Sequence, residues 1–184
     1  MYLDKLFIPI ILGTGRKERQ SQKAADFVFD EIKKQEQIDS EIIDVRTLDQ
    51  KFTERHGKKF ERWRDIAEQA HGFILVFPEY NHGFPGELKI FLDSLTKEYH
   101  RKPTALCGVS SGRFGGVRAV ELIKPVLIDL KMVIVPRSLY FPYIEESFNE
   151  DGSIKDLSYE EKALDLFKDL IWYAKTLKYG RENH

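Results

Sequence analysis

Short apolar runs alternate along the chain with segments whose apolar residues recur every three or four positions. Runs of four to eight apolar residues are typical of strands buried on both faces of a parallel sheet. They predict five strands, over residues 6–12, 41–45, 71–77, 103–110 and 132–135. Pro9 lies inside the first of these. Because proline cannot donate a hydrogen bond to a neighbouring strand, we expect a local irregularity there.

Helical spacing follows most of the strands, since apolar residues three and four apart form one buried stripe. It predicts helices that begin near residue 21 and at residue 158, and helices over 60–70, 88–95 and 116–130, the last with a kink at Pro125. Ser21 is the expected N-cap of the first helix. Ser158 and Glu161 match a capping box for the last, whose final residues we expect to fray.

The segment 137–157 carries no regular pattern and is interpreted as a long connection. Long connections in small proteins are usually functional or disordered. Its aromatic residues predict that it packs on something, with a second subunit as one possibility.

Strands that alternate with helices favour an α/β fold with a doubly wound parallel sheet and helices on both faces. Right-handed crossovers leave few topologies, and of these we expect the five-stranded, flavodoxin-like order 2-1-3-4-5. No repeat, linker or low-complexity segment divides the chain, so residues 1–184 are expected to form one domain. In this order the loops after strands one, three and four meet at one edge, where open α/β sheets bind ligands.

Composition narrows the function classes. The 29 Lys and Arg residues nearly cancel the 30 Asp and Glu residues, so nucleic acid is not an expected partner. No apolar run approaches the length of a membrane span, and the run FIPIIL is too short for a signal peptide. Cys107 is the single cysteine and lies in an apolar run, which indicates a buried packing residue and a cytoplasmic location. No histidines show metal-ligand spacing, so no metal site is expected.

The loop GTGRKERQS at 13–21 has the chemistry of an anion site. It precedes a helix N-terminus, whose free N–H groups suit a phosphate. Thr14 and Ser21 add hydroxyl groups, and Arg16 and Arg19 add charge. The dinucleotide fingerprint fails because Glu18 stands where its third glycine belongs, and no P-loop motif is present. A solvated basic turn is the alternative interpretation of this loop.

Two other loops offer neutral binding groups. The loop PEYNHGFPG at 78–86 is stiffened by two prolines, and its glycines allow close approach of a ligand. The loop SSGRFGG at 110–116 presents small residues and main-chain N–H groups against which a flat ring could lie. Arg113 and Arg118 could meet a second phosphate, such as that of a nicotinamide nucleotide. Ordinary turns between strand and helix are the alternative for both.

With these motifs the chain resembles the NADPH-dependent FMN reductase family of flavodoxin-like flavoproteins, which includes quinone- and azo-reducing members. The resemblance rests on G-T-G-R-x-x-R-x-S at 13–21, P-E-Y-N-x-G-x-P-G-x-L-K at 78–89 with Asp93, and S-S-G-R-F-G-G at 110–116. It covers residues from about 8 to 135. The middle motif is the most specific.

The resemblance implies FMN as the bound cofactor and NADPH or NADH as the co-substrate. Carried across, the FMN phosphate would be held by Thr14, Arg16 and Ser21, with Arg19 matching an arginine of some branches. The ring would be wrapped by Pro78, Glu79, Tyr80 and Asn81, and the ribityl and pyrimidine side would be closed by Ser110, Ser111 and Gly112. A homodimer or tetramer is expected, with residues 82–98 and 137–157 near the interface.

The leading functional hypothesis is an FMN-dependent NAD(P)H oxidoreductase. Hydride would pass from the nicotinamide to flavin N5 and then to a quinone, azo compound, free flavin or metal oxyanion. No side chain is expected to act as a catalytic acid or base, so Glu79 is interpreted as capping or pairing with a neighbouring segment. The alternatives are a flavodoxin-like electron carrier, and a flavin-binding sensor that acts through a partner.

Overall fold

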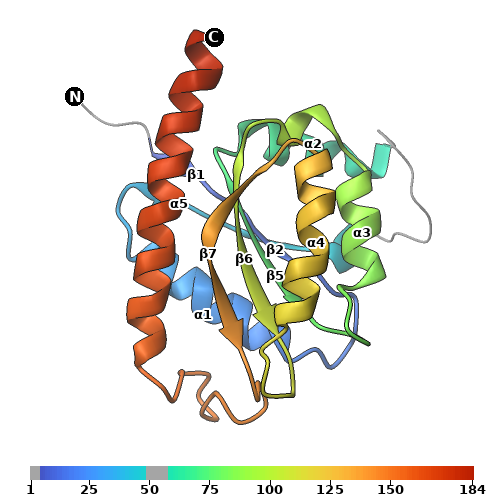
Figure 1. Ribbon diagram of the computed structural model, residues 1–184, viewed down its shortest axis with the longest axis vertical. Helices are drawn as coiled ribbons and strands as arrows, with labels where there is room; N and C mark the ends of the chain where they lie inside the picture. The colour runs from blue at the N-terminus through green and yellow to red at the C-terminus, as the bar shows by residue number, and fades with distance from the viewer. Residues whose placement is uncertain (1–4, 49–57) are drawn as a thin grey trace.

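The computed structural model describes residues 5–48 and 58–184, in which a parallel sheet lies between two layers of helices (Figure 1). The sheet has the order β4-β2-β5-β6-β7. These strands are Ile42–Asp44, Ile10–Leu12, Phe73–Pro78, Pro103–Val109 and Val133–Phe141. All residues of β5 and β6 are buried, as their apolar runs predict. The predicted α/β architecture, with five parallel strands and helices on both faces, is confirmed.

The irregularity expected at Pro9 is confirmed. It divides the first strand into β1 (Leu6–Phe7) and β2, and β1 pairs with β3 (Ile38–Asp39) in a separate two-stranded sheet. Pro9 has no N–H to donate, but its carbonyl still accepts a 3.1 Å hydrogen bond from the N–H of Ile74. The chain therefore stays beside β5 through the break.

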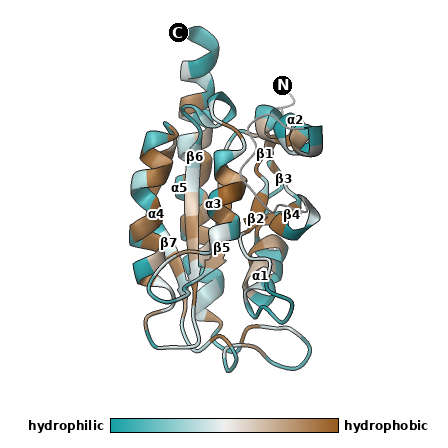
Figure 2. Ribbon diagram, turned by 90° about the vertical axis from the view of Figure 1, so that its right-hand side faces the viewer, coloured by the Kyte–Doolittle hydropathy of each residue, from teal (hydrophilic) through white to brown (hydrophobic). Residues whose placement is uncertain are grey.

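Helices cover the two faces of the sheet unequally. One face is covered by α1 (Ser21–Lys33) and α5 (Ser158–Asn183). The other is covered by α2 (Glu61–Gln69), α3 (Gly86–Asp93) and α4 (Val117–Asp129). Figure 2 shows apolar and polar stretches alternating along α3 and α4, as expected for helices with one buried face. Short 3₁₀ helices lie at Val45–Leu48, Lys58–Phe60 and Lys97–Tyr99.

The last strand is longer than the sequence indicated. β7 runs to Phe141, where the prediction ended at residue 135. Its register shifts on the way, because Ile134 pairs with Thr104 and Ser138 pairs with Leu106. Pro136 lies in this irregular stretch, and an edge strand tolerates a residue without an N–H. The longer strand carries the chain to the same edge as the ends of β2, β5 and β6 (Figure 1).

The connection after β7 packs on its own chain. Ile144, Phe148 and Ile154 are buried in the core formed with α1 and α5. Phe148 stacks on Phe141 with ring centroids 6.4 Å apart and meets the ring of Phe27 at the same distance. The packing predicted for these aromatic residues therefore exists within one subunit.

Three predictions about helix ends are wrong. Ser21 is the first residue of α1, Gln20 is the N-cap, and no side chain caps this end. The capping box of α5 does not form, because Asp156 accepts the hydrogen bond from the N–H of Ser158 at 3.0 Å. The end of α5 does not fray either, since Arg181 donates to the carbonyl of Arg101 at 2.7 Å.

α4 continues through Pro125 as one helix. Within the described ranges no helix combines the length and the apolar character needed to cross a membrane.

Candidate functional site

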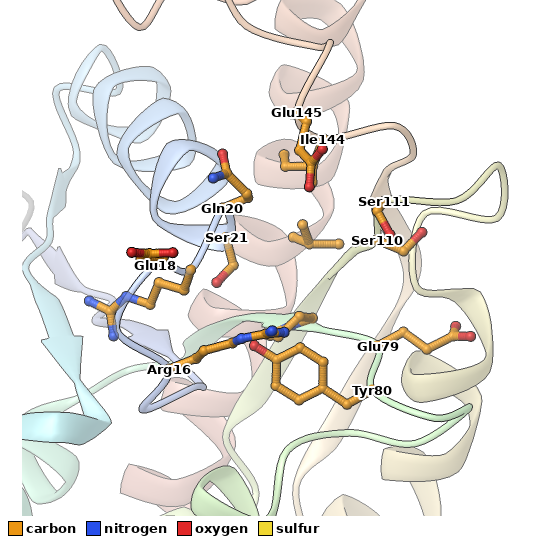
Figure 3. A pocket seen from close by; sticks show the side chains of 13 residues that line it. Arg16, Glu18, Gln20, Ser21, Glu79, Tyr80, Ser110, Ser111, Ile144 and Glu145 are labelled. Carbon is orange, nitrogen blue, oxygen red and sulfur yellow. The ribbon is translucent and has the colours of Figure 1, made fainter.

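A pocket of about 360 Å³ lies where the loops after β2, β5 and β6 meet (Figure 3). The sequence analysis named eight of the residues that line it: Arg16, Arg19, Ser21, Pro78, Glu79, Tyr80, Ser110 and Ser111. The three loops therefore converge as expected. Of the remaining predicted ligands, Thr14 lies beneath the pocket, Asn81 lines a neighbouring hollow, and Gly112 lies in the third loop without lining the pocket.

Two buried polar atoms beside the pocket have no hydrogen-bond partner. They are Ser21 Oγ, whose residue is 1% exposed, and Gln20 Oε1. Both residues line the pocket at the start of α1. Buried polar groups are almost always satisfied, and a helix N-terminus offers free N–H groups and the positive end of the helix dipole. This end of the pocket therefore suits an anion that accepts hydrogen bonds from a hydroxyl group.

Arg16 is the exposed cation of the first loop that lines the pocket. Its guanidinium carbon lies 5.6 Å from the centroid of the Tyr80 ring, and Figure 3 shows the side chain reaching across the pocket beside that ring. Below it, the buried Thr14 Oγ1 lies 3.1 Å from the Tyr80 hydroxyl. Thr14 therefore ties the first loop to the second instead of facing the ligand space.

Arg19 has a different environment from the one the sequence suggested. It is 7% exposed, and its guanidinium makes two hydrogen bonds to Asp44, at 2.6 and 2.7 Å. It also donates to the carbonyl oxygen of Thr14 and to Gln22, both at 2.7 Å. With four of its five N–H groups engaged, Arg19 holds the first loop against the end of β4. We interpret it as a positioning residue at the pocket wall.

The second loop contains a tight turn. The N–H groups and carbonyls of Tyr80 and Gly83 exchange hydrogen bonds, both 2.9 Å long. The two residues between them, Asn81 and His82, have φ angles of 48° and 65°. Two successive positive φ angles define a type I′ turn, which asparagine tolerates and histidine adopts under strain. The turn directs Asn81 toward an open hollow of about 600 Å³, which shares Arg16, Glu79 and Tyr80 with the pocket.

Glu79 makes the pairing proposed for it from the sequence. Its carboxylate accepts hydrogen bonds from the side chain of Arg118 at 3.0 Å and from the main-chain N–H of Arg118 at 3.2 Å. The second loop is thereby fixed to the start of α4. Arg118 also lies over one exposed ring, Phe114, with its guanidinium carbon 4.7 Å from the centroid.

Arg113 stacks on the same ring of Phe114, at 4.5 Å. It makes no ion pair or hydrogen bond with the residues that the structure describes. Neither Arg113 nor Arg118 lines the pocket; Arg113 lies in the third loop and Arg118 in α4.

The third loop owes its shape to two successive glycines with positive φ, Gly115 and Gly116. Gly116 has a φ of 85°, and a Cβ atom there would lie 2.6 Å from the main-chain nitrogen of Val109. Only glycine allows this close approach of α4 to the end of β6. Ser110 Oγ donates to the carbonyl of Gly112 at 2.8 Å, while Ser111 is exposed toward the pocket.

Five lining residues escaped the sequence analysis: Glu18, Gln20, Val109, Ile144 and Glu145. Ile144 and Glu145 follow β7, whose true end was placed six residues too early. Their position after a strand is the signal that could have identified them, because the loop after every parallel strand begins at this edge of the sheet. In the described residues no group of three or more His, Cys, Asp or Glu side chains could hold a metal ion.

Two of the strongly altered pKa values concern residues discussed above, Cys107 and Asp44. Burial raises the pKa of Cys107 to about 12, so its thiol stays protonated and serves packing. Burial alone would also raise the pKa of Asp44, but hydrogen bonds from Arg19 and Arg46 outweigh it and hold this pKa well below its usual range. The Asp44 carboxylate is therefore charged at neutral pH.

Comparison with known proteins gives one consistent result. The family model for NADPH-dependent FMN reductase matches residues 8–146. The NAD(P)H-dependent FMN reductase ntnL of Nectria sp. is 29% identical, over 91% of this chain and 98% of its own length. The NADPH azoreductase of Bacillus sp. is 26% identical, over 92% of this chain and 93% of its own length. The structure of FerB, a flavoenzyme NAD(P)H:(acceptor) oxidoreductase from Paracoccus denitrificans, superposes with a TM-score of 0.75 at 20% identity, covering 92% of this chain and 98% of that one.

The Arg19–Asp44 pair generates a prediction about stability and its pH dependence. Asp44→Asn leaves the buried guanidinium of Arg19 without its counter-charge, which should lower the free energy of unfolding by about 3 kcal/mol at pH 7. The folded pKa of Asp44 lies below its unfolded value of about 4, so its contribution is complete above that value and is lost as the pH falls through the folded pKa. Urea unfolding from pH 7 down to pH 3 measures the difference, which should shrink below about pH 4.

Asp39→Asn is the matched control. Asp39 pairs with Lys5 in the open, with side chains 61% and 55% exposed, so its loss should change stability by less than about 1 kcal/mol. Equal effects of the two substitutions would contradict the positioning role of Arg19.

Proposed function

Since the chain belongs to the NADPH-dependent FMN reductase family, we propose that the pocket at the carboxyl edge of its sheet holds FMN, through which the enzyme passes hydride from NAD(P)H to a small electron acceptor. It is an FMN-dependent NAD(P)H oxidoreductase. The carrier and sensor alternatives lose their support, because the family and its curated relatives are reductases. We count β2, β4, β5, β6 and β7 as strands one to five and infer the flavodoxin-like order 2-1-3-4-5.

The observation that carries the assignment of the pocket is the unpartnered hydroxyl of Ser21. It lies buried at the start of α1, in a pocket that also contains the free guanidinium of Arg16. A phosphate would accept hydrogen bonds from both groups and from the N–H groups of the helix. The dimensions support the same ligand, because 360 Å³ lies within the range of cofactor pockets.

The other two loops supply the ring end. Pro78, Glu79 and Tyr80 line the pocket from the second loop, and Ser110 and Ser111 line it from the third, with Gly112 next to them in the chain. Asn81 reaches the ring from the adjoining hollow. Thr14 supports this wall through the Tyr80 hydroxyl, and Arg19 supports the phosphate end through the shape of the first loop.

Bound FMN supplies the chemistry of accepting and returning a hydride. The task of the chain is to bind and orient it, and we assign no side chain of the pocket the role of a proton donor. Hydrogen bonds between Tyr80 and Gly83 and from Ser110 Oγ to Gly112 fix the two loops before a ligand binds, so little rearrangement is needed on binding. The open hollow of about 600 Å³ beside Tyr80 is where we place the acceptor, a quinone, azo compound, free flavin or metal oxyanion.

The nicotinamide nucleotide would use the arginines of the third loop. Arg118 is already paired with Glu79, whereas Arg113 is exposed and without an acidic partner in the described ranges. We therefore assign the contact with the co-substrate phosphate chiefly to Arg113, with Arg118 beside it. NADPH carries one phosphate more than NADH, so Arg113 would favour NADPH.

Two wider properties complete the proposal. Intracellular location in the cytoplasm fits the single, buried and protonated Cys107. A homodimer fits the outer face of α4, where Leu122 is 55% exposed and Ile128 is 63% exposed. α3 lies against α4, since both line one hollow, so residues 82–98 would border the interface. Residues 137–157 would reach it only through exposed side chains such as Tyr143.

Substitutions in the phosphate end should separate FMN from riboflavin, which lacks the phosphate. Ser21→Ala and Arg16→Ala each remove one hydrogen-bonding group, so each should weaken FMN binding about tenfold or more. Riboflavin binding should change less than about threefold. Quenching of flavin fluorescence during titration measures both affinities, with Lys17→Ala, a nearby exposed cation, as the control. If both flavins lose affinity equally, the phosphate lies elsewhere.

Turnover tests the reductase assignment itself. The FMN-loaded protein should oxidise NADPH in the presence of a quinone, and Arg113→Gln should raise KM for NADPH about tenfold while changing KM for NADH much less. Arg137→Gln is the control, since Arg137 is an exposed arginine on β7 that pairs with Asp169 and does not line the pocket. An FMN-loaded protein that binds NADPH without oxidising it would overturn the enzymatic assignment.

The oligomeric state has its own test. We expect a dimer in sedimentation equilibrium at micromolar concentration, and a monomer after the double substitution Leu122→Glu and Ile128→Glu, because two buried charges would oppose association. Trp172→Glu on α5, where the side chain is 61% exposed, should leave the dimer intact. A wild-type monomer under these conditions rules the proposal out.

A further inference from the structure

The loop after β7 is held in place against the third loop. The N–H of Ile144 donates to the carbonyl of Ser110 at 3.1 Å, and the N–H of Tyr143 donates to the carbonyl of Gly112 at 3.3 Å. Ser147 Oγ donates to the carbonyl of Tyr143 at 3.0 Å. Ile144 is 3% exposed and anchors the loop in the core. The position of this loop is therefore fixed before any ligand binds.

The backbone of the loop turns toward the pocket through a strained conformation. Tyr143 has a φ of 46°, a left-handed conformation that a bulky side chain rarely adopts. Such strain persists only where the surrounding contacts impose it, and it is frequent at binding sites. The turn brings two successive residues, Ile144 and Glu145, into the lining of the pocket.

Glu145 has no role in holding the fold. Its carboxylate makes no hydrogen bond or ion pair with the described residues, and the residue is exposed. The next residue, Glu146, carries the same charge but does not line the pocket, and its N–H is engaged with the carbonyl of Tyr143 at 2.8 Å. Two neighbouring carboxylates therefore differ in one respect, which is access to the ligand.

The place of Glu145 identifies the part of a ligand that it meets. Figure 3 shows Ile144 and Glu145 between Gln20 and Ser21 on one side and Ser110 and Ser111 on the other. The first pair belongs to the proposed phosphate end and the second to the proposed ring end. Between phosphate and ring, FMN carries a chain of neutral hydroxyl groups. A carboxylate only accepts hydrogen bonds and repels a phosphate, so hydroxyl groups are its suitable partners.

We propose that the loop 142–147 forms a fourth wall of the flavin pocket, and that Glu145 binds the ribityl hydroxyl groups of FMN. This inference rests on the proposed function, since it requires FMN in the same pocket. Glu145 is a binding and positioning residue, and Ile144 supplies the apolar surface beneath the ribityl chain.

Three flavins and two matched substitutions test the proposal. FMN and riboflavin carry the ribityl chain, whereas lumiflavin has the ring alone. Glu145→Ala should weaken the binding of FMN and of riboflavin by the same factor, about 5- to 20-fold, and should change the affinity for lumiflavin by less than about twofold. Glu145→Gln keeps one acceptor, so its affinity for FMN and riboflavin should lie between those of the wild type and Glu145→Ala. Glu146→Ala should bind all three flavins as the wild type does. Dissociation constants come from fluorescence titration of the apoprotein, with thermal unfolding as a check on folding.

Three results would overturn the proposal: unchanged or tighter FMN binding by Glu145→Ala, an equal loss for lumiflavin, or an equal loss in Glu146→Ala. The first would mean that the carboxylate faces away or repels the phosphate, and the others would mean that the loop acts only through its fold. A wild type that binds none of the three flavins would instead refute the proposed function. Failure of the two inferences is therefore distinguishable.

Discussion

A buried ion pair, Arg19 with Asp44, fixes the loop on which the rest of the site depends. Asp44 ends β4, and Arg19 ends the loop after β2, so the pair joins neighbouring strands at their carboxyl ends. Arg19 also holds the carbonyl of Thr14, and the hydroxyl of Thr14 contacts Tyr80 in the second loop. One buried guanidinium thus sets the shape of the first loop and the place of the ring that forms the pocket wall. Removing Asp44 would leave the buried guanidinium of Arg19 without its counter-charge.

Similar contacts link the remaining loops in sequence around the edge. Glu79 joins the second loop to the start of α4, and Ser110 joins the third loop to Ile144 after β7. Three residues with left-handed backbone lie at the same edge, Asn81, His82 and Tyr143. Polar contacts therefore fix the walls, while Ser21 and Gln20 keep unpartnered atoms toward the pocket. A site prepared in this way can bind a cofactor with little loss of conformational entropy on the side of the protein.

The sequence predicted the fold and the meeting of three loops because both follow from hydrophobic periodicity and from the rule that parallel strands end at one edge. It did not predict the pairing of Arg19, because a loop arginine can face solvent, ligand or its own chain. The deciding partner, Asp44, is 25 residues away in the sequence and adjacent only in the fold. Ser21 was mistaken for a cap for a related reason, since a hydroxyl at a helix start serves helix or ligand equally well. Pro136 interrupts the apolar run of β7, so the second half of this strand and the loop 142–147 after it were not predicted.

Hydrogen–deuterium exchange of the main-chain amides, with and without FMN, tests the central claim most directly. We expect FMN to slow exchange in 13–21, 78–81, 110–112 and 142–147 together, since these segments lie far apart in the sequence and share one pocket. The far ends of β5 and β6 should exchange at the same rate in both states. Protection confined to one of these segments, or located at the opposite edge of the sheet, would contradict the account.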